Sequence, residues 1–292
     1  MKQILVATDF STRSDRALRR AVLTARQVGA ELTLVHVVDD DQPNYLIERQ
    51  KAAAAEILQQ TVSTLVDVDQ IRAEWLITTG DAFTGILQVA EEADPALIIV
   101  GPHRRQFLDT FVGTTAERTI RRSRHPILMV NAVPSGPCRR SLVAVDFDEA
   151  SEVAINAMSE LDISAAGDII ALHLFDAPAI GMMKRAMEVQ DAIDHYVSQQ
   201  EDRARSELTS FLAKCRLDSA QLMLSPLKGS ASAAISACAI EQEADLIVLG
   251  TNQRKGLERF LLGSVAQGVL LDATQDVLIV PVIAADDLTI NG

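Results

Sequence analysis

Short apolar runs alternate with longer amphipathic segments along the chain. A run of four to eight apolar residues is typical of a buried strand, and apolar residues three or four apart indicate a helix. In the first half the pattern predicts strands at 3–8, 32–38, 71–78, 96–100 and 127–131, and helices at 12–28, 45–66, 82–93 and 114–122. Gly29 follows the first helix, where glycine commonly ends helices. Strands that alternate with helices predict a parallel sheet with right-handed crossovers.

The second half of the chain repeats the first. The segment LIIVGPHRRQFLDTFVGTTAE at 97–117 recurs as LIVLGTNQRKGLERFLLGSVA at 246–266. Asp9 and His36 have counterparts in the second half at one constant offset. The later segments are shifted further, because the second half carries an insertion between its second and third strands. Such a long internal repeat predicts two similar structural units.

The repeat predicts two domains in place of one. Each has about 140 residues, which is enough for a hydrophobic core of its own. The run of proline, serine and glycine after the fifth strand is typical of a linker. The predicted bounds are 1–132 for the first domain, 133–138 for the linker, 139–284 for the second domain and 285–292 for a C-terminal tail.

In each half an apolar strand is followed by a glycine, a basic loop and a second glycine that opens a helix. Gly101 and Gly250 are expected to end their strands, and Gly113 and Gly263 precede the helices. Backbone N–H groups in such a loop and at the helix start can bind a phosphate. An ordinary strand-to-helix connection with glycines at its turns has the same pattern, so this alternative stays open here.

A doubly wound parallel sheet binds ligands outside the carboxyl ends of its strands, where the strand order reverses. The residues expected there in the first half are Thr8, Asp9 and Gly101. Their counterparts in the second half are Val145, Asp146 and Gly250. The pattern therefore predicts one pocket in each half.

These features together resemble the universal stress protein family, with two family domains fused in tandem over essentially the whole chain. The resemblance implies an α/β fold of two doubly wound domains, each a five-stranded parallel sheet flanked by helices. It also implies an intrachain pseudo-dimer in which the last strands pair and cover each other's apolar edges. The features that carry it are strand-end aspartates and histidines, strand-end glycines, and a glycine with serine or threonine before the last helix: Asp9, Asp146, His36, His173, Gly101, Gly250, Gly113 with Thr114, and Gly263 with Ser264.

Nucleotide-binding members of this family carry a loop of Gly, two residues, Gly, nine residues, Gly and then Ser or Thr. The second half keeps this length but has Gln253 at the middle glycine, where a side chain now stands in place of bare backbone. The first half has Arg104 there and is one residue shorter. The resemblance implies an ATP or AMP pocket, with the second half as the better site. The implied contacts are Thr8, Asp9, Val37, Val100, Gly101, Arg104, Gly113 and Thr114, and in the second half Val145, Asp146, Leu174, Leu249, Gly250, Gln253, Arg254, Gly263, Ser264 and Val265.

Several of these residue types also have an ordinary structural interpretation. The aspartates at 9 and 146 can be helix N-caps or turn residues. The histidines at 36 and 173 are expected to be structural rather than general bases. The loop pairs Arg104 with Arg105 and Arg254 with Lys255 are either solvated charges or phosphate clamps. Thr114 and Ser264 begin their helices, where capping is the expected role.

The inserted segment PAIGMMKRAMEV at 178–189 has an adaptable apolar surface because it contains three methionines. We expect it to form a lid helix on its own domain. A cover for an apolar ligand or for a protein partner is the alternative.

Composition narrows the class of protein. A hydrophobic content of 48% with 23% charged residues is typical of a globular chain. No apolar run reaches the ~18 residues of a membrane span, and the first residues lack a signal peptide's apolar region and cleavage site. Cys138, Cys215 and Cys238 have neither disulfide nor zinc-site spacing. These features predict a cytoplasmic protein without a membrane partner or a metal.

The net charge of −13 is concentrated in the second half, with 12 basic against 23 acidic residues in 139–292. Such acidity argues against a nucleic-acid partner.

We find no catalytic motif that assigns a base or a nucleophile, so the chain is predicted not to be an enzyme, although slow ATP hydrolysis stays open. The predicted function is a stress-response protein that binds ATP or AMP. The alternatives are a nucleotide-free scaffold or regulator that binds a protein partner and, third, a nucleotide-dependent enzyme. An additional homodimer is left open.

Overall fold

The computed structural model describes residues 2–102, 114–163, 167–186, 189–252 and 262–282. The first half has the strands β1 Gln3–Ala7, β2 Glu31–Val38, β3 Ala73–Thr79, β4 Leu97–Val100 and β5 Ile127–Met129. Its helices are α1 Thr12–Val28, α2 Asn44–Asp67, α3 Ala82–Ala93 and α4 Thr115–Arg122. The predicted order of elements is confirmed, and most bounds shift by one or two residues. Gly29 is the C-cap of α1, as predicted, and has a left-handed conformation at φ 67°.

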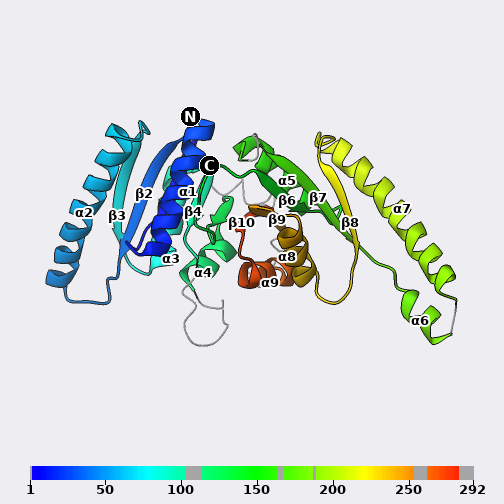
Figure 1. Cartoon of the computed structure of the whole chain (residues 1–292). Coiled ribbons are helices and arrows are strands. Elements are labelled where there is room, and N and C mark those ends of the chain that lie inside the picture. Colours follow the sequence, from blue (N-terminus) through cyan, green and yellow to red (C-terminus); the bar gives the residue numbers. More distant parts are fainter. Residues whose placement is uncertain (1, 103–113, 164–166, 187–188, 253–261, 283–292) are drawn as a thin grey trace, which may run out of the picture.

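The second half repeats this order (Figure 1). Its strands are β6 Arg140–Ala144, β7 Asp168–Phe175, β8 Gln221–Pro226, β9 Leu246–Asn252 and β10 Asp276–Val282. Its helices are α5 Glu149–Leu161, α6 Ile180–Arg185, α7 Gln190–Lys214, α8 Ala231–Glu241 and α9 Ser264–Asp272. The domain bounds at 132 and 139 stay a prediction.

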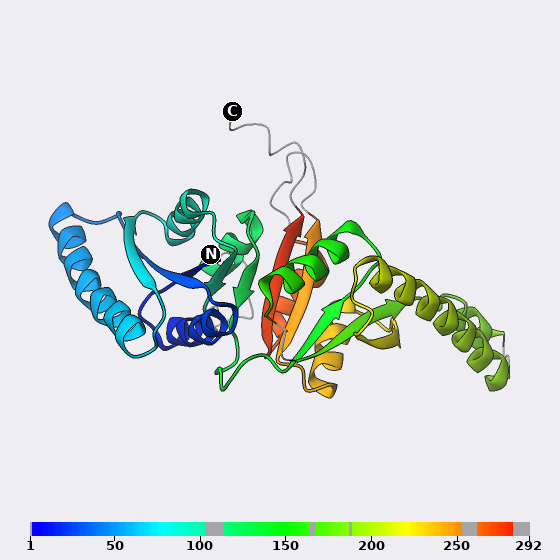
Figure 2. The same ribbon diagram turned by 90° about the horizontal axis from the view of Figure 1, so that it is seen from above.

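All ten strands form one sheet in the order β3-β2-β1-β4-β5-β10-β9-β6-β7-β8. Every pairing within a half is parallel, and β5 pairs with β10 in antiparallel register. The two halves therefore meet edge to edge through their last strands (Figure 2). This confirms the predicted intrachain pseudo-dimer. Within the described residues, no helix is long and apolar enough to cross a membrane.

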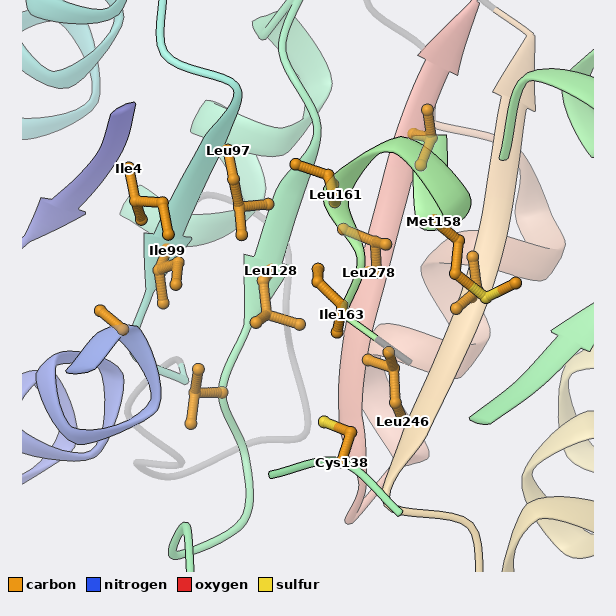
Figure 3. Packing of buried hydrophobic residues seen from close by; sticks show 14 of the residues in the cluster. Ile4, Leu97, Ile99, Leu128, Cys138, Met158, Leu161, Ile163, Leu246 and Leu278 are labelled. Atoms are coloured by element: carbon orange, nitrogen blue, oxygen red, sulfur yellow. The ribbon is translucent and has the colours of Figure 1, made fainter. Parts of the chain in front are cut away.

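Buried side chains cover both faces of the sheet and continue across the junction of the halves. One cluster lies under α1, α2, α5 and α7, and the other under α3, α4, α8 and α9. Leu128 of β5 and Leu278 of β10 are register partners, and Figure 3 shows them side by side in the first cluster. Burial of large aliphatic side chains on both faces explains why these strands are continuous apolar runs.

A buried ion pair also joins the halves. Arg20 of α1 donates from Nε to Asp276 of β10 at 2.8 Å, and the two side chains are 5% and 0% exposed. The other oxygen of Asp276 accepts hydrogen bonds from the backbone N–H groups of Asn131 and Ala132. One carboxylate therefore connects a helix, the end of β5 and the start of the interdomain segment to the second half.

The inserted segment contains the short helix α6. Helix α6 packs against the beginning of α7, where the Ala179 N–H donates to the Tyr196 hydroxyl at 3.4 Å. Figure 1 shows α6 away from the sheet. The segment therefore packs on a helix of its own half, and its role as a lid stays a prediction. Two apolar residues of this segment are exposed to solvent: Met182 in α6 is 63% exposed, and Val189, which precedes α7, is 68% exposed.

Candidate functional site

The first half has a cavity of about 440 Å³ at the carboxyl ends of β1, β2 and β4. The walls also include residues from the start of α1, from α3 and from the start of α4. Six of the predicted contacts line this cavity: Thr8, Asp9, Val37, Val100, Gly101 and Thr114. Arg104 and Gly113 lie outside the described residues. The strand ends thus converge on one pocket, as their topology predicts.

Asp9 occupies a turn between β1 and α1. Its Oδ1 accepts hydrogen bonds from the N–H and hydroxyl of Ser11 at 3.0 and 2.5 Å, and Arg13 lies 3.7 Å from its Oδ2. Burial raises the pKa of Asp9, but these hydrogen bonds, with Ser14 and Arg13, bring that pKa below its ordinary value. The N-cap of α1 is Ser11. Asp9 is therefore a turn carboxylate that also faces the cavity.

Each strand-end histidine supports the turn beside it. The Nδ1 of His36 lies 2.9 Å from the Thr8 carbonyl oxygen, and the ring stacks on Phe10 with centroids 4.3 Å apart. In the second half His173 lies 2.8 Å from the Val145 carbonyl oxygen and 4.2 Å from the Phe147 ring. These contacts confirm the structural interpretation of both histidines.

The strand-end glycines are explained by packing. An ideal Cβ on Gly101 would lie 2.8 Å from the Arg13 carbonyl oxygen, and one on Gly250 would lie 1.9 Å from the Ala150 carbonyl oxygen. In each half the first turn of the first helix, α1 or α5, therefore lies directly against the strand at this glycine. Gly101 ends β4 as predicted, but β9 continues through Gly250 to Asn252 because it pairs with β10 over that length. The prediction that Gly250 ends its strand is wrong.

The helix starts also differ between the halves. Thr114 caps α4, since its hydroxyl accepts from the Glu117 N–H at 3.1 Å. In α9 the N-cap is Gly263, which has no side chain to accept, and Ser264 is the first helical residue. The expected capping role is therefore confirmed for Thr114 and wrong for Ser264.

In the second half the corresponding strand ends carry larger side chains. Leu172, Leu174 and Leu249 stand where the first cavity has Val35, Val37 and Val100. Leu249 is buried, and Leu174 and Val265 pack against the same hydrophobic cluster. Gln253 and Arg254 lie outside the described residues. Each leucine is one methylene group larger than its valine counterpart, so these strand ends leave less room than those of the first half.

The charges at the two strand-end sites differ as well. Burial and the nearby Asp148 and Asp176 raise the pKa of Asp146, although His173 opposes them. Asp148 caps α5 at the position of Ser11, and Ala150 replaces Arg13. The second site therefore has three neighbouring carboxyl groups and lacks the arginine of the first.

Sequence reasoning missed Arg13, Ala82, Ile86 and Thr115, which all line the first cavity. Arg13 follows Asp9 by one helical turn, and the second half lacks its counterpart. That difference between the repeats was the available signal. Nothing in the sequence pattern distinguishes Ala82 and Ile86 from other apolar positions of α3.

The whole chain is similar to known proteins of one family. The Universal stress protein family matches residues 1–131 and 138–281. A universal stress protein from Mycolicibacterium smegmatis is 24% identical over 95% of this chain and 96% of that protein. The structure of a universal stress protein from Archaeoglobus fulgidus superposes with a TM-score of 0.73 over 96% of this chain and 98% of that chain, at 18% identity.

A universal stress protein family protein from Arabidopsis thaliana, solved with AMP bound, is 19% identical over 44% of this chain and 90% of that chain, with a TM-score of 0.35. The family match covers both halves and most of the sequence. The chain belongs to the universal stress protein family.

Proposed function

We propose that the first half binds an adenine nucleotide at the carboxyl ends of β1, β2 and β4. The observation that carries this proposal is the cavity of about 440 Å³. Its apolar walls, from Val35, Val37, Val100 and Ile86, suit a planar purine, and polar groups stand at its rim. Asp9 is placed to accept hydrogen bonds from ribose hydroxyls, because its carboxylate is acceptor-only.

The charges around the two sites also favour the first half as the nucleotide site. A phosphate approaching the first cavity meets Arg13 beside one carboxylate, Asp9, whereas the described part of the second site carries Asp146, Asp148 and Asp176 and has Ala150 in place of that arginine. Like charges at short range disfavour an anionic ligand by a larger amount where the site is half-buried. The first half is therefore the better site for a phosphorylated ligand on these grounds.

Loop spacing leads to the opposite ranking. It predicts the second half as the better site, and it depends on Gln253 and Arg254, which lie outside the described residues. That ranking stays a prediction. Titration of AMP into variants of each half compares the two sites directly.

Filling the first cavity should weaken nucleotide binding. The double change Val37→Leu with Val100→Leu introduces the residues that the second half carries at these positions. One methylene in an apolar pocket changes recognition by about 10- to 200-fold, so we expect at least a roughly tenfold loss of AMP affinity. Calorimetric titration of the full chain measures it.

The matched control makes the reverse change, Leu174→Val with Leu249→Val, in the second half. It should leave AMP affinity unchanged. If the control raises affinity while the first-half variant binds like wild type, the second half is the site. Mass spectrometry of small molecules released from freshly purified protein tests independently whether a nucleotide is bound.

Arg13→Ala should weaken AMP binding more than adenosine binding. Arg13 is 32% exposed, so its charge is partly screened and we expect a loss of about fivefold for AMP. Adenosine has no phosphate and should bind almost unchanged. Arg19→Ala removes the same charge from the same helix at a position outside the cavity and serves as the control. An equal loss for both ligands would contradict a role for Arg13 in phosphate recognition.

A second candidate is a surface for a protein partner. It is favoured by the exposed Met182 and Val189 beside α6. Purified protein that is free of nucleotide but retains a stable partner would support it over nucleotide binding. A cytoplasmic location and the absence of catalytic turnover stay predictions.

A further inference from the structure

Both halves build the same support under the strand-end aspartate. A phenylalanine follows the aspartate in the left-handed region, at φ 59° for Phe10 and 56° for Phe147. Its ring packs on a histidine near the end of the neighbouring strand, and the histidine Nδ1 lies within hydrogen-bond distance of the carbonyl oxygen before the aspartate. The two copies agree to 0.1 Å in both distances, measured from Nδ1 to the oxygen and between ring centroids.

This conformation needs support from its surroundings. A bulky residue with a left-handed backbone is strained, and such a residue persists only when its neighbours hold it. In the first half three further interactions fix the same turn. The Thr8 N–H donates to the Val35 carbonyl at 2.9 Å, and the Phe10 N–H donates to the Thr8 hydroxyl at 3.1 Å. The Asp9 carboxylate accepts from Ser11.

The hydrogen bond also sets the protonation of the ring. A carbonyl oxygen can only accept, so His36 must carry its proton on Nδ1 and is a donor there. The imidazole therefore ties the end of β2 to the end of β1, and the stacked Phe10 covers it. Asp9 lies between Thr8 and Phe10 in the chain, and both Asp9 and His36 line the cavity.

We propose that His36 and Phe10 are positioning residues that hold the turn of Thr8 and Asp9 in its ligand-binding shape before a ligand arrives. This inference rests on the proposed nucleotide site. A rigid turn binds more tightly than a mobile one because less order is lost on binding. His173 and Phe147 hold the corresponding turn of the second half.

Two amide substitutions separate positioning from simple loss of the ring. In His36→Asn the side-chain amide nitrogen lies near the position of Nδ1 and can donate to the Thr8 carbonyl. In His36→Gln the longer side chain carries that nitrogen toward the position of Nε2, away from this carbonyl. We expect His36→Gln to lose about tenfold in AMP affinity, and His36→Asn to stay within about threefold of wild type.

The second half supplies the control. His173→Gln removes the same hydrogen bond at a comparable structural cost and should leave AMP affinity unchanged. Thermal unfolding of each variant checks that the chain is folded, and AMP affinity is measured on the full chain by calorimetry. Equal losses in His36→Gln and His173→Gln would overturn the inference, as would wild-type affinity in all three variants. No binding of AMP or ATP by the wild-type chain would overturn the proposed function and this inference with it.

Discussion

Gly250→Ala is expected to destabilise the second half strongly. An ideal Cβ there would lie 1.9 Å from the Ala150 carbonyl oxygen and 2.3 Å from its carbon, so the first turn of α5 must move away from β9. Overpacking a well-packed interior costs about 1–3 kcal/mol, and a clash with backbone lies at the upper end or beyond it. We therefore expect the free energy of unfolding to fall by about 3 kcal/mol. Chemical denaturation followed by circular dichroism measures the change.

Two other glycines calibrate this result. Gly263→Ala adds a Cβ with no heavy atom within 4 Å and should lower stability by less than about 1 kcal/mol, because alanine is only a poorer N-cap than glycine. Gly101→Ala brings the new carbon to 2.8 Å from the Arg13 carbonyl oxygen, so its loss of stability should lie between those of the other two variants. If Gly250→Ala is as stable as the wild type, the close approach of α5 does not explain this glycine.

Asp276→Ala is expected to lower the free energy of unfolding by at least as much as Gly250→Ala. The change leaves the Arg20 guanidinium buried without its partner, at 5% exposure, and removes the acceptor for the Asn131 and Ala132 N–H groups. Removing one partner of a buried ion pair typically costs about 3–5 kcal/mol, because an uncompensated charge stays in the interior. Urea denaturation should show a loss of this size. Trp75, the single tryptophan, lies in β3, so its fluorescence reports on the first half.

The double variant Arg20→Met with Asp276→Leu is the control. Apolar residues of similar volume often replace a buried ion pair with little cost. The double variant should therefore recover most of the stability that Asp276→Ala loses. A double variant as unstable as the single one would mean that the polar groups of Asn131 and the interdomain segment, rather than the unpaired arginine, dominate the loss.

Much of the fold followed from local pattern. The alternation of apolar strands with amphipathic helices, and its repetition, are properties of neighbouring residues, so the order of the elements and the bounds of α1 and α3 were predicted correctly. The strand-end location of the pocket followed from topology alone. The pairing of β5 with β10 was implied by the family resemblance, and the apolar character of both edge strands agrees with it.

The errors share a different cause. Gly250 was interpreted as the end of its strand because glycine often interrupts strands, but β10 extends β9 past it. The close approach of α5 to that glycine joins residues about 100 positions apart, and Arg20 and Asp276 are 256 positions apart. Such contacts leave no periodic signal in one sequence. The sequence also predicted one pocket in each half without indicating how the side-chain volumes at positions such as 37 and 100 would differ in effect between the halves, because no motif encodes them.

The antiparallel contact of β5 with β10 allows the sequences of the two halves to diverge independently. In a dimer of identical chains, both subunits carry the same pocket, and dilution separates them. Here the contact is held within one polypeptide, so it persists at any protein concentration. One half can then lose its cavity, or acquire an acidic rim, while it still shields the edge of the other. Fusion thus separates the task of covering an edge from the task of binding a ligand.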